Sequence, residues 1–332
     1  MSGTKSVIRI ALDGTGGDRQ ANFYKGIAGS VRFASLVNQQ AEFIVFGEHE
    51  LEEALAQEGI ERSRYEFRLA PQAIPQDADP KSVLKDYQNS AMSQAIASVR
   101  DGEARAVVSA GGTGPLVALS RHILGSMNKL RPALCVRMPA GPGHYTLMLD
   151  LGANAEAHAE DLKDFALLGH AASRFLLNID RPKVALLNVG SESNKGNALI
   201  REARDLIKQH SKLDFQGYVE ANRIFFGDTD VIVTDGFTGN VALKAAEGVA
   251  HIFAHADGIK RFFAKLAMPD WLQPWQYNGA LLLGVNGIVV KSHASARQEA
   301  LAVALVEAVK AASTDLDTAM HRELDSLLNQ EA

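Results

Sequence analysis

The stretch VIVTDGFTGNVALK, residues 231–244, contains the strand, turn and helix from which the fold can be inferred. Its first four residues are apolar or β-branched without polar alternation, which predicts a buried strand. Asp235 ends this strand, and Thr238, Gly239 and Asn240 open a predicted helix over 241–248. Asp235 therefore stands at the carboxyl end of a parallel strand, where open α/β sheets place their ligands.

This strand-to-helix turn has two interpretations. Glycines allow backbone N–H groups to converge, and a helix N-terminus carries partial positive charge, so the turn can hold an anion. In the alternative, the turn is structural and Thr238 caps the helix. The two interpretations stay open until the rest of the chain is considered.

Length and composition narrow the class of protein. A chain of 332 residues, with 46% hydrophobic and 22% charged residues, is long enough for about two globular domains. The net charge of −5 argues against nucleic acid as a partner. Cys135 is the only cysteine, which excludes an intrachain disulfide and a Cys-based zinc site. Because we identify neither a signal peptide nor an apolar run of bilayer length, we expect a soluble protein of a reducing compartment.

The same order of strand, glycine-rich turn and helix recurs along the chain. The predicted strands that end in such turns cover 6–12, 104–109, 147–151, 184–189 and 231–234. This recurrence is typical of a doubly wound α/β enzyme whose loops line one cleft. The first turn, DGTGGD at 13–18, is not a G-x-G-x-x-G fingerprint, so dinucleotide binding is weakly supported. Residues 71–80 are rich in Pro and Asp and are predicted to form a loop.

Residues 258–268 are predicted to form an amphipathic helix. Ile259, Phe262, Phe263 and Leu266 share one face, cationic residues lie opposite, and Trp271 follows Pro269. This combination suits an interfacial membrane helix, whereas packing on the core or on a second subunit is the alternative.

Near the C-terminus, two apolar runs separated by a glycine turn lead to Lys291 and His293. If 288–290 is a strand, both side chains point the same way at its end. A long helix over 294–311 and a partly frayed terminal helix over 314–332 are predicted to follow.

The chain lacks a G-x-S-x-G nucleophile elbow and a Walker phosphate loop. Asp13, Asp18 and Asp235 could ligate a metal, but their spacing matches no metal motif, so no metal is predicted. What remains is a set of anion-binding turns with Lys195, Lys244 and Lys291, and His293 as an acid–base group. Such a site suits transfer to or from phosphate. Taken singly, each lysine is also typical of a surface residue and His293 of a structural histidine.

Several motifs stand in order along the chain. They are DGTGGD at 13–18, SAGGTGP at 109–115, RPAL at 131–134, LDLGAN at 149–154, NVGSESNKGN at 188–197, TDGFTGNVALK at 234–244, YNGALLLG at 277–284 and GIVVKSH at 287–293. These motifs resemble those of the phosphate acyltransferase (PlsX) family of bacterial phospholipid synthesis. The likeness extends from Ile10 to about Ala296.

The resemblance implies a three-layer α/β/α fold like that of isopropylmalate dehydrogenases and phosphotransacetylases. It implies one enzyme unit over 1–332 with two lobes around a cleft, as a homodimer. The implied reaction converts acyl–acyl carrier protein and inorganic phosphate to acyl phosphate and free carrier protein, without a cofactor. It also implies a cytoplasmic protein in peripheral contact with the inner face of the membrane through a protruding tip at 258–275.

The resemblance supplies the positions of the site residues, and their chemistry suggests roles. Lys291, His293, Asp235 and Asn240 are the predicted catalytic residues, with His293 either orienting phosphate or protonating the departing thiolate. The predicted phosphate- or substrate-binding residues are Asp13, Gly16, Gly17, Ser109, Gly111, Gly112, Thr113, Gly114, Asn188, Lys195, Asn197, Thr238, Gly239 and Lys244. The predicted membrane tip comprises Ile259, Phe262, Phe263, Leu266 and Trp271.

Four segments depart from the family pattern. The turn DGTGGD at 13–18 stands where the family has D-A-M-G-G-D. Gly112 and Pro115 stand where the family motif has Asn and Ala. Residues 87–91 lack two lysines and an Asp that the family has there. Residues 217–221 contain Tyr218 and Ala221 where the family has Asn and Gly. These changes leave open a diverged paralogue that is non-catalytic, or that takes another acyl donor or acceptor. NAD-dependent oxidation, a third hypothesis, is disfavoured by the missing fingerprint.

Overall fold

The computed structural model describes residues 7–19, 22–254 and 278–329. Its contacts divide the chain into two compact units. Unit 1 takes in Met1–Met127 and Asn278–Asp317, and unit 2 takes in Asn128–Tyr277 and Thr318–Ala332. The cleft predicted between two lobes stays a prediction.

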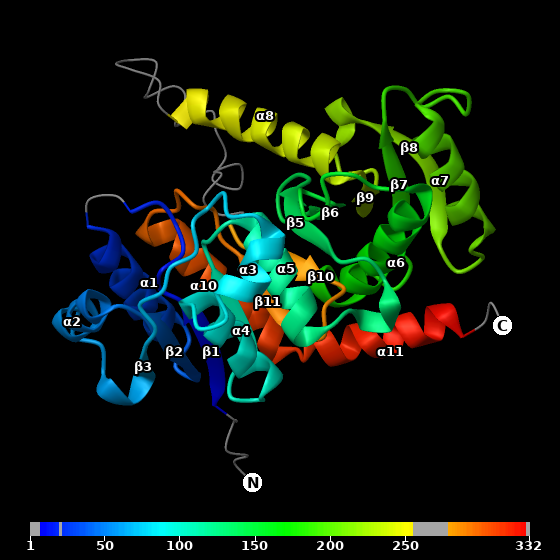
Figure 1. Ribbon diagram of the computed structural model, residues 1–332. Helices are drawn as coiled ribbons and strands as arrows, with labels where there is room; N and C mark the ends of the chain where they lie inside the picture. The colour runs from blue at the N-terminus through cyan, green and yellow to red at the C-terminus, as the bar shows by residue number, and fades with distance from the viewer. Residues whose placement is uncertain (1–6, 20–21, 255–277, 330–332) are drawn as a thin grey trace, which may run out of the picture. The chain divides into compact units, whose positions relative to one another are not determined.

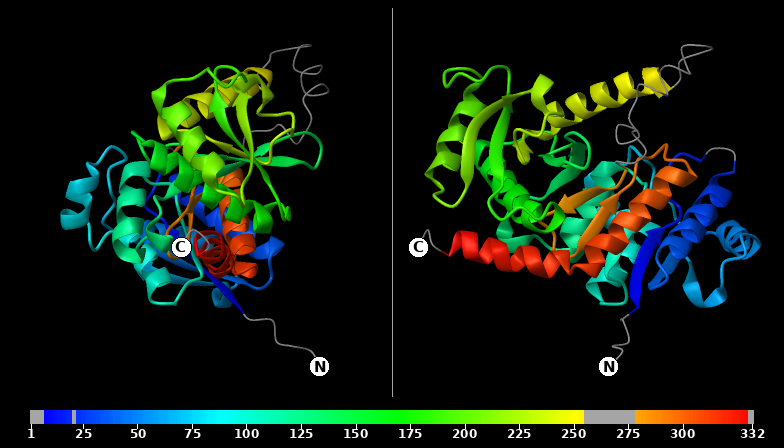
Figure 2. Two further views of the ribbon diagram at one scale, coloured as in Figure 1. Left: turned by 90° about the vertical axis from the view of Figure 1, so that its right-hand side faces the viewer. Right: turned by 180° about the vertical axis from the view of Figure 1, so that it is seen from behind.

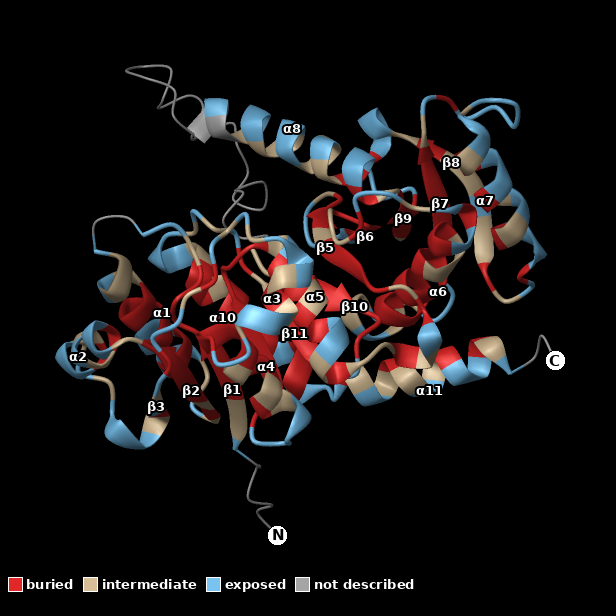
Figure 3. Ribbon diagram, in the orientation of Figure 1, coloured by how far each residue is buried: buried red, intermediate tan, exposed pale blue. Residues whose placement is uncertain are grey.

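Unit 1 is built on a mostly parallel sheet with the strand order β3-β2-β1-β4-β11-β10. Only β10 runs antiparallel to its neighbour within this set. The strands are β1 (Ile8–Asp13), β2 (Ala41–Gly47), β3 (Tyr65–Leu69), β4 (Ala106–Ser109), β10 (Ala280–Leu283) and β11 (Ile288–Lys291). The four residues of β4 are all buried, as expected for a central parallel strand (Figure 3).

Helices cover both faces of this sheet. The helices α3, α4 and α5 pack together on one face, whereas α1 and α10 pack together on the other (Figures 1 and 2). Their bounds are α1 (Phe23–Val37), α2 (His49–Gln57), α3 (Pro80–Asp86), α4 (Ala91–Arg100), α5 (Thr113–Leu124) and α10 (Gln298–Ser313). The result is the predicted three-layer α/β/α arrangement.

Local sequence explains where two of these helices begin. Asp79 caps α3 by accepting hydrogen bonds from the backbone of Lys81 and Ser82, and Pro80 occupies the first helical position. Ser90 caps α4 through the backbone N–H of Ser93, over 3.2 Å.

Unit 2 has the strand order β5-β6-β9-β7-β8, in which only β5 is antiparallel to its neighbour. Its elements are β5 (Ala133–Pro139), β6 (Tyr145–Leu149), α6 (Ala159–Leu176), β7 (Lys183–Asn188), α7 (Ala198–Gln209), β8 (Asp214–Glu220), β9 (Val231–Val233) and α8 (Gly236–Ala254), with most of α11 (Leu316–Leu328). Helix α6 contacts β5, β6, β7 and β9, and α8 contacts β6.

The structure corrects several predicted elements. Helix α8 begins at Gly236 and ends at Ala254, outside the predicted 241–248 on both sides. Helix α3 was missed because its start was assigned to a loop, and β5 and β8 were missed altogether. The predicted terminal helix over 314–332 is α11, Leu316–Leu328 among the described residues, and it buries Leu316, Met320, Leu324 and Leu327.

The predicted tip at 258–275, with all five of its named residues, lies outside the described residues. Within the described ranges, no helix is both long and apolar enough to cross a membrane.

Candidate functional site

Three strands of unit 1 end side by side in residues that the sequence analysis selected. The parallel register pairs Asp13 of β1 with Ser109 of β4, and Ser109 with Lys291 of β11. Because the carboxyl ends of parallel strands meet at one edge of a sheet, the turns that follow also lie together. Ser292 N donates to the Ser109 carbonyl over 2.8 Å, which joins two of these turns directly.

The Asp13 carboxylate organises the first turn. Its Oδ1 accepts hydrogen bonds from Thr15 N, Thr15 Oγ1 and Gly16 N over 2.8–3.2 Å, and its Oδ2 accepts one from Ser109 Oγ over 2.7 Å. Burial raises the pKa of the Asp13 carboxyl, and the bonds from Ser109 and Thr15 oppose this shift in part. This carboxylate is therefore committed to holding the turn.

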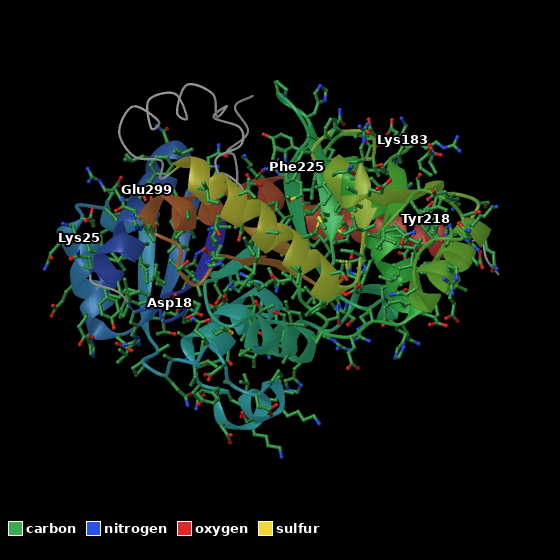
Figure 4. All side chains as sticks on the ribbon, turned by 90° about the horizontal axis from the view of Figure 1, so that it is seen from above. Asp18, Lys25, Lys183, Tyr218, Phe225 and Glu299 are labelled. Carbon is green, nitrogen blue, oxygen red and sulfur yellow. The ribbon has the colours of Figure 1, made fainter. Side chains whose placement is uncertain are left out.

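Asp18, labelled in Figure 4, is the last residue of the same turn. Its backbone N–H donates to the Ala294 carbonyl over 2.8 Å, which ties the turn to the loop after β11. Gly16 and Gly17, both predicted binding residues, lie between these two anchors.

The N-terminus of α5 presents backbone amides without internal partners. Gly111 N donates to Ser109 Oγ over 3.0 Å. By contrast, the amides of Gly112, Thr113 and Gly114 have no acceptor in the described part of the chain, and no side chain caps this helix. Converging free amides at a helix N-terminus are suited to binding an anion.

His293 lies in the loop that follows β11 and is exposed. Its Nδ1 accepts the backbone N–H of Ser295 over 3.2 Å and lies 2.8 Å from Ser295 Oγ. Since a backbone N–H can only donate, Nδ1 carries no proton in this arrangement, and a neutral ring donates through Nε2. Lys291 Nζ donates to the Ser292 carbonyl.

Asn278 is a supporting residue that the sequence analysis did not select. Its Oδ1 accepts His293 N over 2.9 Å, and its Nδ2 donates to Ser292 Oγ over 2.8 Å and to the Ala300 carbonyl over 2.6 Å. It therefore fixes the backbone between Lys291 and His293. The signal available in the sequence was its place in the motif YNGALLLG.

In unit 2, Asp235 caps α8. Its Oδ1 accepts Thr238 N over 2.9 Å, and its carbonyl accepts Gly239 N over 2.9 Å. The alternative in which Thr238 caps the helix is therefore wrong, because the helix begins two residues before Thr238. The carboxylate predicted to be catalytic has at least this structural role.

Asp150 is a second buried carboxylate that the sequence analysis did not select, although it stands in the motif LDLGAN. Its two oxygens accept five hydrogen bonds, from the backbone of Leu134, Gly152, Ala153 and Asn154 and from Asn154 Nδ2. Burial raises its pKa, and these bonds oppose the shift.

The turn held by Asp150 packs tightly on the first turn of α8. A Cβ atom at Gly239 would lie closer than 3.0 Å to the Asp150 carbonyl, and one at Gly236 would overlap the Asn154 carbonyl. These two glycines are thus required by a close backbone approach. A Cβ atom at Gly152 would lie 3.2 Å from Asn240 Nδ2, so Asn240 also lies against this turn.

The loop after β7 holds the remaining predicted residues of unit 2. Asn188 Nδ2 donates to the Gly190 carbonyl over 3.2 Å, and Asn197 caps α7 by accepting Ile200 N over 2.9 Å. Lys195 is exposed in this loop, and Lys244 is exposed on α8. Neither lysine has an ion-pair partner among the residues that the structure describes.

The structure thus brings the predicted residues together in two sets. The set in unit 1 lies on adjacent strand ends and turns and comprises Asp13, Gly16, Gly17, Ser109, Gly111, Gly112, Thr113, Gly114, Lys291 and His293. In unit 2, Asp235, Thr238, Gly239 and Asn240 meet the Asp150 turn, and Asn188, Lys195 and Asn197 share the loop after β7. No group of three or more potential metal ligands occurs in the described ranges.

The segments that depart from the family pattern fold into ordered elements. Tyr218 of β8, labelled in Figure 4, pairs with Leu186 of β7. It lies next to a bulge at Gly217, whose φ is +88°. Residues 87–91 lead into the Ser90 cap of α4.

Comparisons with known proteins agree with this architecture. A phosphotransacetylase from Streptococcus pyogenes superposes with a TM-score of 0.62 at 17% identity, over 92% of this chain and 94% of that chain. A branched-chain phosphotransacylase from Enterococcus faecalis V583 gives 0.59 at 15% identity, over 92% and 99%. At these identities the likeness shows the fold.

Sequence relatives define the family. The family described as "Fatty acid synthesis protein" matches residues 8–318. A phosphate acyltransferase of Aeromonas salmonicida is 40% identical over 96% of this chain and 97% of its own length. One from Ehrlichia canis is 37% identical over 96% and 99%.

The protein is an acyltransferase with a three-layer α/β fold. More particularly, the chain belongs to the phosphate acyltransferase family.

Proposed function

We propose that this chain transfers the acyl group of an acyl–acyl carrier protein to inorganic phosphate, and that the acyl phosphate serves phospholipid synthesis. The single observation that supports the proposal is that free backbone amides and a lysine meet at one edge of the unit 1 sheet. There, the free amides of Gly112, Thr113 and Gly114 lie on the turn next to the strand that ends in Lys291. Amides and a cation together suit a phosphate dianion.

In this reaction, an oxygen of monohydrogen phosphate attacks the carbonyl carbon of the thioester. The new C–O bond forms, the C–S bond breaks, and the proton of the phosphate ends on the thiol of the carrier protein. Phosphate is the nucleophile, so no cysteine of the enzyme is needed, and Cys135 is buried. The amides and Lys291 stabilise the phosphate charge while it is held for attack.

His293 orients the phosphate. The hydrogen bond from Ser295 N to Nδ1 supports a neutral ring that donates through Nε2. A donor of this kind can hold a phosphate oxygen, whereas protonating a thiolate would require the ring to lose its only proton. The orienting role is therefore favoured over the acid role. The catalytic roles of Asp235 and Asn240 stay predictions.

The experiment follows radioactive phosphate into an organic-soluble product during incubation with a long-chain acyl–acyl carrier protein. We expect label in an acyl phosphate, in equal amount to the thiol released. Thiol release without labelled product would indicate a thioesterase and would contradict the proposal. Within the described residues, no feature favours the non-catalytic alternative.

We also propose that α8 contributes to a homodimer. Phe237, Val241, Val249 and Ile252 are exposed on one side of this helix, and Phe237 and Ile252 are 70% and 71% exposed. A second copy of the chain would remove this apolar surface from water. Light scattering should show a dimer that Val249→Asp weakens. Leu36→Asp, at an exposed apolar position of α1, is the control and should leave the dimer intact.

Peripheral membrane contact through 258–275 is proposed on the sequence pattern alone. Vesicles with anionic lipid should carry the wild-type protein in flotation, and the double variant Phe262→Asp/Phe263→Asp should stay in solution. Equal flotation of both proteins would dismiss the contact.

A further inference from the structure

The space around Gly112 is closed by another segment of unit 1. Gly112 is the N-cap of α5 with φ −53° and ψ 138°, a conformation open to any residue. Nevertheless, a Cβ atom there would overlap the carbonyl oxygen of Gln76, lie 3.0 Å from its carbonyl carbon and lie 3.1 Å from Pro115 Cδ. Because the nearest obstacle is backbone, rotation of a side chain cannot relieve the overlap.

Gln76 belongs to the connection between β3 and α3. The segment from Gln76 to Pro80, the first residue of α3, contacts residues 110–114 around the start of α5 at three places. Gln76 Nε2 donates to the Ala110 carbonyl over 3.4 Å. The Gln76 carbonyl lies against Gly112, and Pro80 Cγ lies 3.2 Å from the position of a Cβ atom at Gly114. Ala110, Gly112 and Gly114 are therefore each contacted by this segment.

The connection is itself fixed at both ends. The Gln72 carbonyl accepts Ala91 N over 3.1 Å, and Gln72 Nε2 donates to the Asp86 carbonyl over 3.0 Å. Ile74 is buried, and the Asp79 cap begins α3. Gln76 is thus supported as a rigid contact rather than as the tip of an open loop.

We infer that Gln76 is a positioning residue for the phosphate-binding turn, and that its backbone occupies the space that a side chain at position 112 would need. This inference rests on the proposed function, because it assigns the three free amides of the turn to phosphate. The motif of the resembling family has Asn at this position, whereas this chain has Gly112 together with the Gln76 contact. The position of the Gln76 backbone therefore requires glycine at 112.

The contact between Gly112 and Gln76 predicts how the enzyme responds when Gly112 is replaced by the asparagine of the family motif. Gly112→Asn should displace the Gln76 backbone and move the amides of Gly112, Thr113 and Gly114. The KM for phosphate should then rise at least about tenfold, even though the relatives' motif carries that residue. A Gly112→Asn enzyme with an unchanged KM for phosphate would overturn the inference.

Charge at Gln76 provides a readout that a purely structural role would not give. Gln76→Glu places a carboxylate beside the turn, so the KM for phosphate should rise about tenfold at low salt and less at high salt, because salt screens the repulsion. The kcat at saturating phosphate should stay within about twofold. Gln76→Ala, which removes one neutral hydrogen bond, should raise this KM about two- to tenfold.

Gln88→Glu is the matched control, since Gln88 is exposed and donates to the Leu84 carbonyl over 3.3 Å. It should leave the KM for phosphate unchanged at every salt concentration. If Gln76→Glu behaves like Gln88→Glu, or lowers kcat with an unchanged KM, the inference is overturned.

The rise in Tm that inorganic phosphate causes should also be measured, because it does not depend on turnover. A rise in the wild type that Gln76→Glu reduces and Gln88→Glu preserves supports the inference, even if no acyl transfer occurs. Acyl transfer with an identical phosphate-induced rise in all three proteins supports the proposed function and overturns the inference.

Discussion

Ser109 Oγ at the end of β4 donates a 2.7 Å hydrogen bond to Asp13 Oδ2 at the end of β1, and the same Oγ accepts Gly111 N over 3.0 Å. One hydroxyl therefore joins two strand ends and the turn before α5. All three groups are buried, so each depends on the others for its hydrogen bonds.

Replacing Ser109 by Ala should lower the free energy of unfolding by about 1–3 kcal/mol, because it leaves a buried carboxylate oxygen and a buried amide without a partner. Urea unfolding measures this change. Ser120→Ala is the control, since Ser120 is buried on α5 and its Oγ has no partner among the described residues. It should not destabilise the protein, because no hydrogen bond is lost. Equal losses in the two variants would contradict this account of Ser109.

Two glycines of α8 should respond to alanine with opposite signs. Gly239→Ala should destabilise the protein by about 1–3 kcal/mol, because the new methyl group meets the Asp150 carbonyl and Thr234 Cγ2. Gly248→Ala should stabilise it by about 0.5–1 kcal/mol, because nothing lies within 4 Å and Ala favours helix. The Tm of each variant, measured by thermal unfolding, tests both predictions. A Gly239→Ala variant as stable as the wild type would contradict the close approach.

His170 should make stability depend on pH. Burial lowers its pKa from 6.5 to about 4, with Arg174 and His210 adding to this shift and Glu323 opposing it. Because the unfolded chain binds the proton more tightly, the contribution of His170 is full above pH 6.5 and is lost as the pH falls towards 4. Between pH 7.5 and 5 this loss is about 2 kcal/mol.

His170→Gln should remove that part of the pH dependence of unfolding, whereas His49→Gln, at an exposed site, should retain it. Parallel pH profiles for the wild type and His170→Gln would contradict the assignment.

Asp235 can be tested as a cap separately from any chemical role. Asp235→Ser keeps an oxygen that can accept Thr238 N, so stability should stay within about 0.5 kcal/mol, whereas Asp235→Ala should lose about 1 kcal/mol. If capping is its main role, kcat of Asp235→Ser should stay within about tenfold of the wild type. A stable Asp235→Ser enzyme with kcat reduced more than about a hundredfold would instead assign Asp235 to the chemistry.

The sequence predicted the parts of the fold that depend on local pattern. Uninterrupted apolar runs followed by glycine-rich turns identified β1, β4, β7 and β9. Their carboxyl ends then had to meet at a sheet edge, as Asp13, Ser109 and Lys291 do.

What escaped prediction depends on irregular or distant features. Strand β5 is flanked by Pro132 and ends in Pro139, and β8 carries the Gly217 bulge, so both resemble interrupted segments. The roles of Asp150 and Asn278 depend on partners that only folding brings near, such as Leu134 and Ala300. The binding role selected for Gly239 stays a prediction, and its close approach to the Asp150 carbonyl could not be read from the sequence.

The most direct test of the central claim is the phosphate dependence of thiol release from a long-chain acyl–acyl carrier protein, compared between wild type, Lys291→Ala and Lys25→Ala. Lys25 is exposed on α1 and serves as the control (Figure 4). We predict turnover that requires phosphate, is unchanged in Lys25→Ala and falls at least about a hundredfold in Lys291→Ala. Thiol release that is independent of phosphate, or that survives intact in Lys291→Ala, would contradict the account.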